Sequence, residues 1–237
     1  MKRPYIVCHM VSSIDGGVTG EYLSCPECEA ATETYYAINR EYKENGSNGF
    51  ICGRVTMQES FAGEWYPDLS VYESDGELIP SVFLPDEEKM TGFYAVSFDP
   101  SGRLGWRSAF IEDCDPGYDK AQIVEILTEQ ADSRFLKYLM DVGIPYIIAG
   151  KKEIDVSKAL EILYTHMGIK LLLLEGGSIV NGYFLRAGCV DEISLVEAPL
   201  IAGKESKPIF SECGVYDFVL SDVQIRDGVP VKKYKRK

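Results

Sequence analysis

The chain contains 237 residues, 46% of them hydrophobic, and carries a formal net charge of −13 at pH 7. The length and apolar content fit a single domain over residues 1–237, while the negative charge argues against nonspecific binding to nucleic acid or to an anionic membrane, because both are negatively charged themselves. The N-terminus lacks a secretory signal pattern and no apolar run is long enough to cross a bilayer, so we expect a cytoplasmic protein.

The N-terminal half alternates apolar runs with helical patterns. Strands are predicted over residues 4–12, 49–53, 93–98 and 121–128, although the last of these also suits a helix, and residues 106–111 are predicted as a strand or an extended piece. A helix is predicted over residues 29–44, and residues 56–61 are consistent with the start of another. Residues 63–91 are instead rich in Trp, Tyr, Pro, Asp and Glu and show no periodicity. This composition predicts a long loop or a lid inserted into the domain.

The C-terminal half continues the alternation. Helices are predicted over residues 132–142, 155–167 and 179–187, and strands over residues 145–149, 169–174, 191–198 and, as one or two strands around Asp227-Gly228, 218–235. Parallel neighbouring strands need a crossover connection, which is usually a helix. The alternation therefore predicts an α/β fold with a largely parallel sheet.

Four glycine-containing turns follow predicted strands: Asp15-Gly16-Gly17, Gly53-Arg54-Val55-Thr56, Ala149-Gly150 and Glu175-Gly176-Gly177-Ser178. The carboxyl ends of parallel strands are where open α/β sheets bind ligands, and the free N–H groups at a helix start attract anions. The turns therefore predict a groove for a nucleotide pyrophosphate, with Arg54 clamping a phosphate and Thr56 donating to it. The alternative is that the glycines serve tight turns and that Arg54 is a solvated surface residue.

Two acidic residues, Asp15 and Glu175, stand at predicted strand ends. A carboxylate in that position can orient a polar substrate, or supply a proton when its pKa is raised. Each also has a structural interpretation, because Asp before Gly commonly caps its own turn and Glu175 can accept from nearby N–H groups. His9 alternates with apolar neighbours and is expected to be a satisfied core group, whereas His166 lies near a helix C-terminus, where partial positive charge is favourable.

The seven cysteines are scattered, and only Cys25 and Cys28 form a C-x-x-C pair. A zinc site needs two more ligands at suitable spacing, and the sequence has neither a second pair nor paired histidines. We therefore expect no metal site and favour an ordinary loop over a redox motif. The sequence also lacks the G-x-G-x-x-G, P-loop and G-x-S-x-G patterns, which leaves the corresponding nucleotide-binding and hydrolase folds without their fingerprints.

Three blocks of the sequence have a counterpart in one known family. They are PYIVCHMVSSIDGGVTG, a strand followed by S-x-D-G; FICGRVT, a strand with a G-R-x-T turn; and LLLLEGGSIVNGYFLRAGCVDEISLVEAPLIAG, a strand, an E-G-G turn, a helix and a further strand. Together they resemble the reductase domain of riboflavin-biosynthesis pyrimidine deaminase/reductases, and the second block is shared with dihydrofolate reductases. The last block is the most specific, and the likeness covers most of the chain.

The resemblance implies a dihydrofolate-reductase-like α/β fold, with a mixed, mostly parallel sheet flanked by helices, and a homodimer. It also implies that NADPH reduces a ribosylamino-pyrimidine phosphate with opening of the ribose ring. The residues implied to bind the cofactor are Gly53, Arg54, Thr56, Ser97, Gly150, Gly176, Gly177 and Ser178. Ser97 is expected just after a strand, beside the adenosine 2′-phosphate. Asp15 and Glu175 match positions on the substrate side and are the predicted catalytic residues.

The sequence departs from the family pattern on the substrate side. The zinc deaminase half is absent, Gly17 stands where the family usually has lysine, and the basic R-x-R-like segment appears as Asn39-Arg40-Glu41-Tyr42-Lys43. We therefore expect NADPH-dependent reduction of a small heterocyclic or carbonyl/imine substrate, with Trp65 and Tyr66 closing over the nicotinamide. The alternatives are the 5-amino-6-(5-phosphoribosylamino)uracil reductase of riboflavin biosynthesis and a nucleotide-binding module without catalysis. Asp99 leaves the preference for NADPH over NADH open, because its charge would repel a 2′-phosphate.

Overall fold

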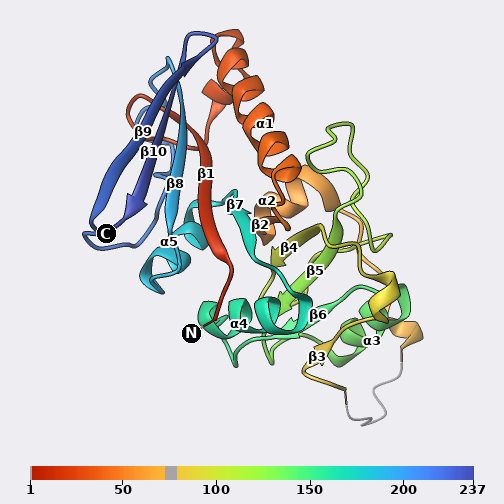
Figure 1. Cartoon of the computed structure of the whole chain (residues 1–237). Helices are drawn as coiled ribbons and strands as arrows, with labels where there is room; N and C mark the ends of the chain where they lie inside the picture. Colours follow the sequence, from red (N-terminus) through yellow and green to blue (C-terminus); the bar gives the residue numbers. More distant parts are fainter. Residues whose placement is uncertain (1, 73–78) are drawn as a thin grey trace. The chain divides into compact units, whose positions relative to one another are not determined.

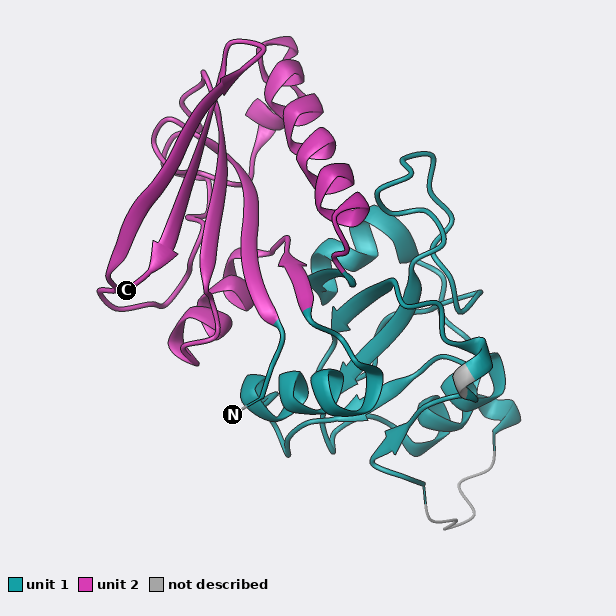
Figure 2. Ribbon diagram, in the orientation of Figure 1, with its two compact units in different colours: residues 1–4, 48–170 teal, residues 5–47, 171–237 magenta. Residues whose placement is uncertain are grey.

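The computed structural model describes residues 2–72 and 79–237 and divides into two compact units. Unit 1 comprises residues 1–4 and 48–170, and unit 2 comprises residues 5–47 and 171–237 (Figure 2). Unit 2 is therefore assembled from segments at both ends of the chain. Each unit is built around its own set of hydrogen-bonded strands.

The strands of unit 1 follow the order β3-β6-β5-β4-β2. Their bounds are β2 (Gly49–Gly53), β3 (Val82–Phe83), β4 (Tyr94–Phe98), β5 (Gln122–Leu127) and β6 (Tyr146–Ile148). β2, β4, β5 and β6 pair in parallel, and only the short β3 is antiparallel. Every residue of β2, β4 and β5 is buried, which agrees with the continuous apolar runs that predicted them.

The helices of unit 1 are α2 (Arg54–Met57), α3 (Ser133–Val142) and α4 (Val156–Met167). The Asp132 carboxylate accepts from the Arg134 N–H at the start of α3, and the Asp155 carboxylate accepts from the Lys158 N–H at the start of α4. Both helices end at a left-handed glycine, Gly143 and Gly168 respectively. The predicted helices over residues 132–142 and 155–167 are thus confirmed, and of the two caps that the sequence allows for the second, Asp155 and Ser157, Asp155 is the N-cap.

The strands of unit 2 follow the order β7-β1-β8-β10-β9. Their bounds are β1 (Tyr5–Ser13), β7 (Leu171–Leu174), β8 (Glu192–Ala198), β9 (Phe218–Arg226) and β10 (Val229–Arg236). β1 is parallel to both β7 and β8, and β10 is antiparallel to both β8 and β9. The tail therefore forms two strands that turn at Asp227-Gly228. The sequence predicted either one or two strands here, and the structure has two.

One face of the unit 2 strands is covered by α1 (Glu29–Glu44), which lies along β1, β8 and β10 (Figure 1). Apolar residues of the helix and of the strands form a common core, among them Ala31, Ile38, Val196 and Val231. The second helix of the unit is α5 (Ser178–Arg186). β9 is the edge strand, and most of its side chains are exposed.

Two predicted elements differ from the structure. Residues 106–111 form no regular strand: Phe110 makes an isolated bridge to Gln122, and the backbones of Ala109 and Ile111 bond to those of residues 120–123. The segment 63–91 contains a 3₁₀ turn at Leu69–Val71 and strand β3, while residues 73–78 of the predicted lid lie outside the described residues.

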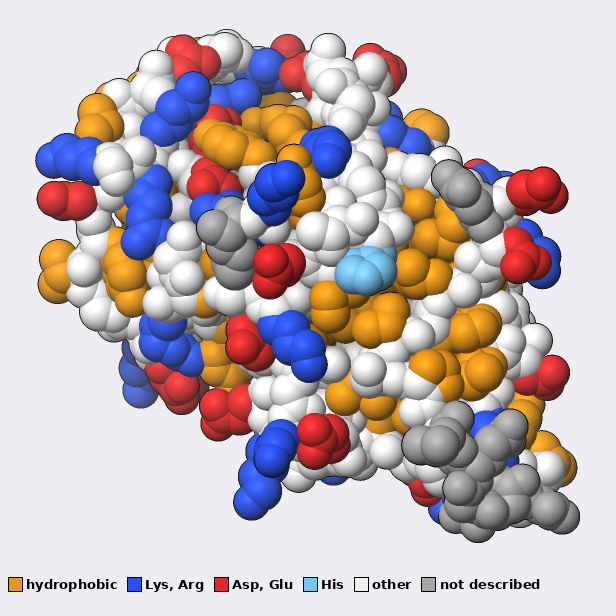
Figure 3. All heavy atoms as spheres, turned by 60° about the horizontal axis from the view of Figure 1, so that its bottom comes forward, with side chains coloured by type: hydrophobic (Ala, Val, Ile, Leu, Met, Phe, Trp, Pro, Cys, Tyr) orange, Lys and Arg blue, Asp and Glu red, His pale blue; other side chains and the backbone are white. Residues whose placement is uncertain are grey.

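The predicted α/β class, with mostly parallel strands and flanking helices, is confirmed. Within the described ranges, no helix has the length and apolar character that a bilayer crossing requires. In the view of Figure 3, acidic and basic side chains are interspersed with apolar ones over the surface.

Candidate functional site

The carboxyl ends of four parallel strands lie along one edge of unit 1. The strand registers align Gly53 with Phe98, Phe98 with Ile126, and Leu127 with Ile148. The turns that follow β2, β4, β5 and β6 therefore meet at this edge, the side of a parallel sheet where ligands bind. It brings together four of the predicted cofactor-binding residues, Gly53, Arg54, Thr56 and Gly150.

Arg54 begins the short helix α2 directly after β2. Gly53 precedes it in an extended conformation with φ −76° and ψ 162°. The Arg54 Nη1 donates to the Gln58 Oε1 at 2.6 Å, so the half-buried guanidinium is tied to its own helix. Desolvation raises the pKa of the neighbouring Asp99, and the positive charge of Arg54 opposes that rise. Arg54 is thus an oriented cation at the edge rather than a freely solvated one.

Gly150 is required by its own turn. Its φ is +153°, and a Cβ there would overlap with the carbonyl oxygen of Glu153. The Gly150 carbonyl accepts from the Glu129 N–H at 2.9 Å, and the Ala149 carbonyl accepts from the Asp155 N–H at 2.6 Å. This backbone packing explains the glycine without a ligand.

Ser97 was expected just after a strand, but it lies within one. It is the fourth residue of β4 and is 0% exposed, facing its register partner Glu125. The residue that follows β4 is Asp99, which is also fully buried and accepts from the backbone N–H groups of Arg103 and Leu104. Asp99 therefore caps a turn, and neither side chain is exposed to a cofactor phosphate.

Ser97, Asp99 and Glu125 form a buried polar cluster that sequence reasoning missed. Glu125 Oε1 accepts from the Trp106 indole N–H, while Ser97 Oγ, Asp99 Oδ1 and Glu125 Oε2 have no hydrogen-bond partner among the described residues. The Ser97 hydroxyl is close enough to lower the pKa of Glu125, although it forms no well-aligned bond. Burial first, and then the charge of Asp99, raise the pKa of Glu125 well above its ordinary value. The signal in the sequence was one acidic residue inside the apolar strand QIVEIL.

Glu175 follows β7 in unit 2, and because Leu174 pairs with Cys8 it lies beside the middle of β1. It is 7% exposed, and its Oε1 accepts from the Asn39 Nδ2 at 2.6 Å. Asn39 belongs to α1 and is itself buried. The sequence singled out the segment around Asn39 for its charge, and it gave no sign that the amide would meet a residue 136 positions away.

Asp15 is held by three donors. Its carboxylate accepts from the Ser13 Oγ at 2.5 Å and from the N–H groups of Ala202 and Gly203 at 2.9 Å each. The Ser13 hydroxyl, followed by the two backbone donors, lowers the pKa of Asp15 to about 2. A carboxylate that remains ionised at neutral pH is a poor proton donor. The contacts favour the structural interpretation of Asp15, which ties the turn after β1 to the loop after β8.

The E-G-G-S turn leads into α5. Gly176 has a φ of +104°, the Gly176–Gly177 peptide bond is cis, and Gly177 is the N-cap of the helix. The Ser178 hydroxyl donates to the Pro208 carbonyl and is 2.5 Å from the Ser211 Oγ. Its side chain is therefore committed to the segment 208–211, so Ser178 could contribute only its backbone N–H to an anion.

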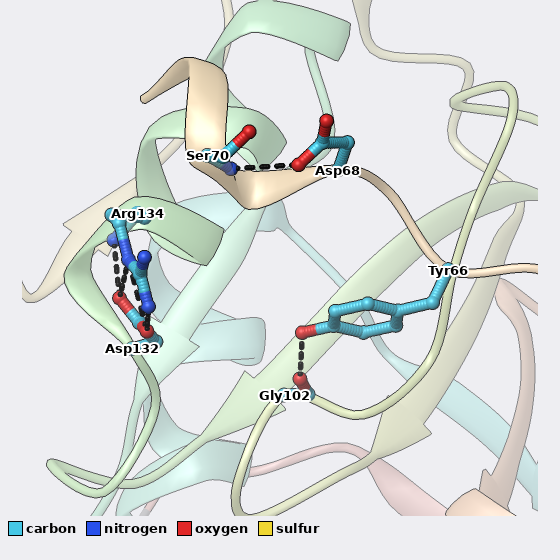
Figure 4. Close-up of polar contacts among 6 residues, drawn as sticks. All are labelled: Tyr66, Asp68, Ser70, Gly102, Asp132 and Arg134. Carbon is cyan, nitrogen blue, oxygen red and sulfur yellow. Dashed lines mark hydrogen bonds and ion pairs between the residues drawn. The ribbon is translucent and has the colours of Figure 1, made fainter. Parts of the chain in front are cut away.

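Trp65 and Tyr66 pack against unit 1 itself. The Tyr66 hydroxyl donates to the Gly102 carbonyl at 2.7 Å (Figure 4), and its ring stacks on Phe135 of α3 with centroids 5.8 Å apart. The Arg107 guanidinium lies 4.5 Å from the centroid of the Trp65 ring. Nearby, the Asp68 carboxylate accepts from the Ser70 N–H and Asp132 pairs with Arg134 (Figure 4). The start of the predicted lid is thus held by aromatic packing and by the hydrogen bond from the Tyr66 hydroxyl to the Gly102 carbonyl.

The remaining candidates have structural partners. His9 is 0% exposed, with Nδ1 3.1 Å from the Ser194 Oγ and Nε2 3.2 Å from the Tyr35 carbonyl, so it is the satisfied core group that was predicted. His166 is exposed in the last turn of α4. Cys25 and Cys28 flank a 3₁₀ turn as free thiols. Within residues 2–72 and 79–237, no three His, Cys, Asp or Glu side chains are arranged to hold a metal ion.

Comparison with known families identifies a large part of the chain. Residues 117–228 match the RibD C-terminal domain family. This match confirms the resemblance stated from the sequence. It includes β5, β6, β7 and β8 and the E-G-G-S turn, and so extends over parts of both units.

Two relatives of known name share shorter segments. The 2,5-diamino-6-ribosylamino-4(3H)-pyrimidinone 5′-phosphate reductase of Aquifex aeolicus is 37% identical over 89 residues, which cover 38% of this chain and 39% of the relative. The protein of the same name from Methanothermobacter thermautotrophicus is 44% identical over 57 residues, which cover 24% and 26%. The chain thus matches less than half the length of these relatives.

Solved structures resemble the whole chain. A pyrimidine reductase-like protein from Corynebacterium diphtheriae superposes with a TM-score of 0.68 and 19% identity, over 99% of this chain and 92% of that one. Acinetobacter baumannii RibD superposes with a TM-score of 0.64 and 20% identity, over 99% and 58%. At this identity the likeness establishes the fold, which is that of the RibD-type reductases.

Proposed function

We propose that the chain is an NADPH-dependent reductase of a ribosylaminopyrimidine 5′-phosphate. The match of residues 117–228 and the names of the two relatives support this reaction over the broader expectation of a small heterocyclic or carbonyl/imine substrate. The observation that carries the proposal is the meeting of the Gly53-to-Thr56 turn with the turns after β4 and β6 at one edge of unit 1. Such an edge suits a dinucleotide.

The residues at this edge fit a nicotinamide dinucleotide in part. Arg54 supplies an oriented positive charge and Gly53 allows the backbone to approach a phosphate. Gly176 and Gly177, ahead of α5, belong to unit 2, and their part in cofactor binding stays a prediction from the sequence. When bound, the reduced cofactor supplies a hydride. Ser97 and the Ser178 hydroxyl are dropped from the cofactor set, because one is buried and the other is bonded to residues 208–211.

Glu175 is proposed to act on the substrate. It stands at the carboxyl end of β7, is 7% exposed and accepts from the Asn39 amide at 2.6 Å, so its carboxylate is held at a strand end, where ligands of such sheets bind. Asp15 is proposed to support this side of unit 2 by fixing the loop at Ala202–Gly203.

The substrate proposal is tested by following NADPH oxidation with two pyrimidines. One is the 2,5-diamino-6-ribosylamino-4(3H)-pyrimidinone 5′-phosphate named for the relatives, and the other is 5-amino-6-(5-phosphoribosylamino)uracil, which differs by deamination at one ring position. We expect the diamino compound to be reduced faster, because it is the compound named for both relatives. Oxidation with neither compound, despite NADPH binding, would instead favour a nucleotide-binding module without catalysis.

The cofactor proposal is tested by titration calorimetry with NADPH and NADH. We expect Arg54→Ala to weaken NADPH binding by about tenfold, which corresponds to the loss of one charge-assisted contact. Arg226→Ala is the matched control. Arg226 is the last residue of the edge strand β9, and it pairs with Glu41 of α1. Equal affinity of wild type and Arg54→Ala would remove Arg54 from the site.

A homodimer is proposed on the exposed strand β9. Val219, Leu220, Val223 and Ile225 are 48%, 53%, 51% and 67% exposed there, and the strand has a free edge that a second copy can pair with about a two-fold axis. Light scattering should give twice the chain mass for the wild type and the chain mass for the double variant Val223→Asp/Ile225→Asp. Val215→Asp, at an exposed position outside the strand, is the control.

A further inference from the structure

Cys25 and Cys28 bracket a 3₁₀ turn that leads directly into the helix α1. The turn covers Pro26–Cys28, and the Cys28 N–H donates to the Cys25 carbonyl at 2.9 Å. Pro26 stands at the first position of the turn, where its fixed φ favours this conformation and no backbone N–H is needed. α1 begins at the next residue, Glu29. The sequence favoured an ordinary loop here, whereas the structure places the C-x-x-C pair at the start of a helix, as a redox motif requires.

The turn brings the two cysteines within reach of a disulfide bond. A 3₁₀ helix rises about 2 Å per residue, so the two ends of one turn lie about 6 Å apart. Disulfides join Cα atoms that are separated by roughly 4.4 to 6.8 Å. Side chains three residues apart in such a turn also project from the same side. Rotation of the two side chains can therefore close the bond without displacing the backbone.

The two thiols differ in access and in contacts. Cys25 is half-buried, and its Sγ lies 3.6 Å from the Glu21 carbonyl oxygen. Cys28 is 0% exposed, belongs to the apolar cluster between α1 and the strands, and has its Sγ 3.8 Å from the Thr32 Oγ1. Thiol–disulfide exchange proceeds through a mixed disulfide on the thiol that is attacked first. An external disulfide can reach Cys25, whereas Cys28 can react only with a sulfur that Cys25 already carries.

The surface around Cys25 is acidic. Glu21, Glu27 and Glu29 all lie within four residues of it along the chain and are exposed. Their negative charges repel an anionic reagent and attract a cationic one, most strongly at low ionic strength. The charges therefore favour a small disulfide with positive charge over one with negative charge.

We propose that Cys25 and Cys28 form a reversible redox-modification site that exchanges with a small, positively charged disulfide. The Cys25 thiol loses its proton to solvent, and its sulfur attacks one sulfur of the external disulfide. The external S–S bond breaks, and the departing thiolate takes up a proton. Cys28 Sγ then loses its own proton and attacks Cys25 Sγ, which releases the second external thiol. Two protein thiols are thus oxidised to a disulfide, and the external disulfide is reduced to two thiols.

Thr32 is the positioning residue for the second step. Its hydroxyl is within hydrogen-bonding range of Cys28 Sγ and one helical turn further along α1. A hydroxyl that donates to a sulfur stabilises the thiolate that must form before Cys28 attacks. The inference concerns a part of unit 2 outside the residues of the proposed reduction and does not depend on it.

The first test incubates the folded full chain with cystamine, a positively charged disulfide, and maps the cysteines by acid quenching, alkylation and peptide mass spectrometry. We expect the wild type to lose the Cys25 and Cys28 thiols together and to keep no cysteamine on either, and dithiothreitol to restore both. Cys28→Ala should stop at a cysteamine adduct on Cys25, and Cys25→Ala should leave Cys28 unmodified. Cys114→Ala removes a single exposed thiol and is the control. A lasting adduct on Cys25 of the wild type, or an unreacted Cys25 beside a reacted Cys114, overturns the inference.

The second test uses variants that keep both cysteines. We expect Thr32→Val to slow closure about tenfold without changing the rate at which the Cys25 adduct forms, because it removes one hydrogen bond to a charged sulfur. Glutathione disulfide, which is negatively charged, should react with the wild type more slowly than cystamine, and Glu27→Gln should narrow that difference. Glu44→Gln, at an exposed glutamate at the far end of α1, is the control. Equal wild-type rates with the two disulfides overturn the charge preference, and unchanged closure in Thr32→Val removes Thr32 from the second step.

Discussion

The two units bury polar side chains in opposite ways. In unit 1, Ser97, Asp99 and Glu125 meet inside the sheet with three oxygen atoms that have no partner among the described residues. In unit 2, both ring nitrogens of His9 have partners and the Asn39 amide donates to Glu175, while Asn181 Oδ1 has no partner among the described residues. Removal of a polar group from water therefore has different outcomes, because the cluster of unit 1 gathers acidic groups whereas the groups around His9 and Asn39 complement each other.

The difference shows what burial alone does to an ionisable group. Desolvation raises the pKa of Glu125, and no donor beyond the Trp106 indole stabilises its charge strongly enough to reverse that effect. At the exposed strand end of unit 2, three donors lower the pKa of Asp15 to about 2. Glu125 therefore behaves as a neutral acid of the core, and Asp15 as a permanent anion of a loop.

The largest expected effect comes from removing the Glu125 carboxyl. Glu125→Ala leaves a cavity and strands the Trp106 indole N–H, so we expect the free energy of unfolding to fall by about 3 to 5 kcal/mol in urea denaturation at pH 5. Glu129→Ala, at an exposed glutamate just after β5, should change it by less than about 0.5 kcal/mol. A small loss for Glu125→Ala would mean that the cluster is not the polar core of unit 1.

Glu125→Gln isolates the charge from the packing. A folded-state pKa above the ordinary value of 4.5 means that the folded protein holds its proton while the unfolded chain releases it. The Glu125 contribution to stability is therefore complete below about pH 4.5 and declines as the pH rises toward the folded pKa. The glutamine variant should lack this decline. Identical pH profiles of wild type and variant would contradict a neutral Glu125.

The local sequence pattern predicted much of the fold. The features that it missed depend on contacts between residues that are far apart in the sequence. The helix over residues 29–44 was predicted to the residue, because its apolar spacing and its Asn45-Gly46 end are local signals. Residues 106–111, predicted as a strand or an extended piece, form only an isolated bridge at Phe110, and the bonds of Trp106 to Glu125 and Tyr138 could not be predicted from the local pattern. In the same way, the sequence located Asp15 and Glu175 at strand ends but could not show that Ala202, Gly203 and Asn39 would hold them.

His9 provides the matching test in unit 2. Burial lowers its pKa to about 4, against the opposing effect of its bonds to Tyr35 and Ser194, and the charges of Lys233 and Arg226 lower it further. The unfolded chain takes up this proton near pH 6.5, so the stability due to neutral His9 is complete above that pH and is lost as the pH falls toward 4. We expect the loss to reach roughly 3 kcal/mol below pH 4. His9→Gln should not show it, whereas His166→Gln, at an exposed histidine, should follow the wild type.

The smallest expected effect concerns the hydroxyl of Tyr66 in unit 1. Burial, followed by the charge of Asp99, raises the pKa of Tyr66 to about 12. Tyr66→Phe removes the hydroxyl bond to the Gly102 carbonyl and should reduce the free energy of unfolding by about 1 kcal/mol, measured by urea denaturation.

Tyr72→Phe is the matched control for Tyr66, because its hydroxyl bonds to Asp141 at a more exposed position and should be worth less. If Tyr66 belongs to a fixed cover, Tyr66→Phe leaves the KM for NADPH unchanged and its stability loss is independent of cofactor. A lid that closes over the nicotinamide would instead raise that KM, since the hydroxyl bond would form part of the closed state. The stacking of Tyr66 on Phe135, 5.8 Å between centroids, already gives this segment a packed position in the protein without a ligand. We therefore expect the first outcome, in which the bond of Tyr66 to Gly102 and its stacking on Phe135 belong to the permanent packing of unit 1.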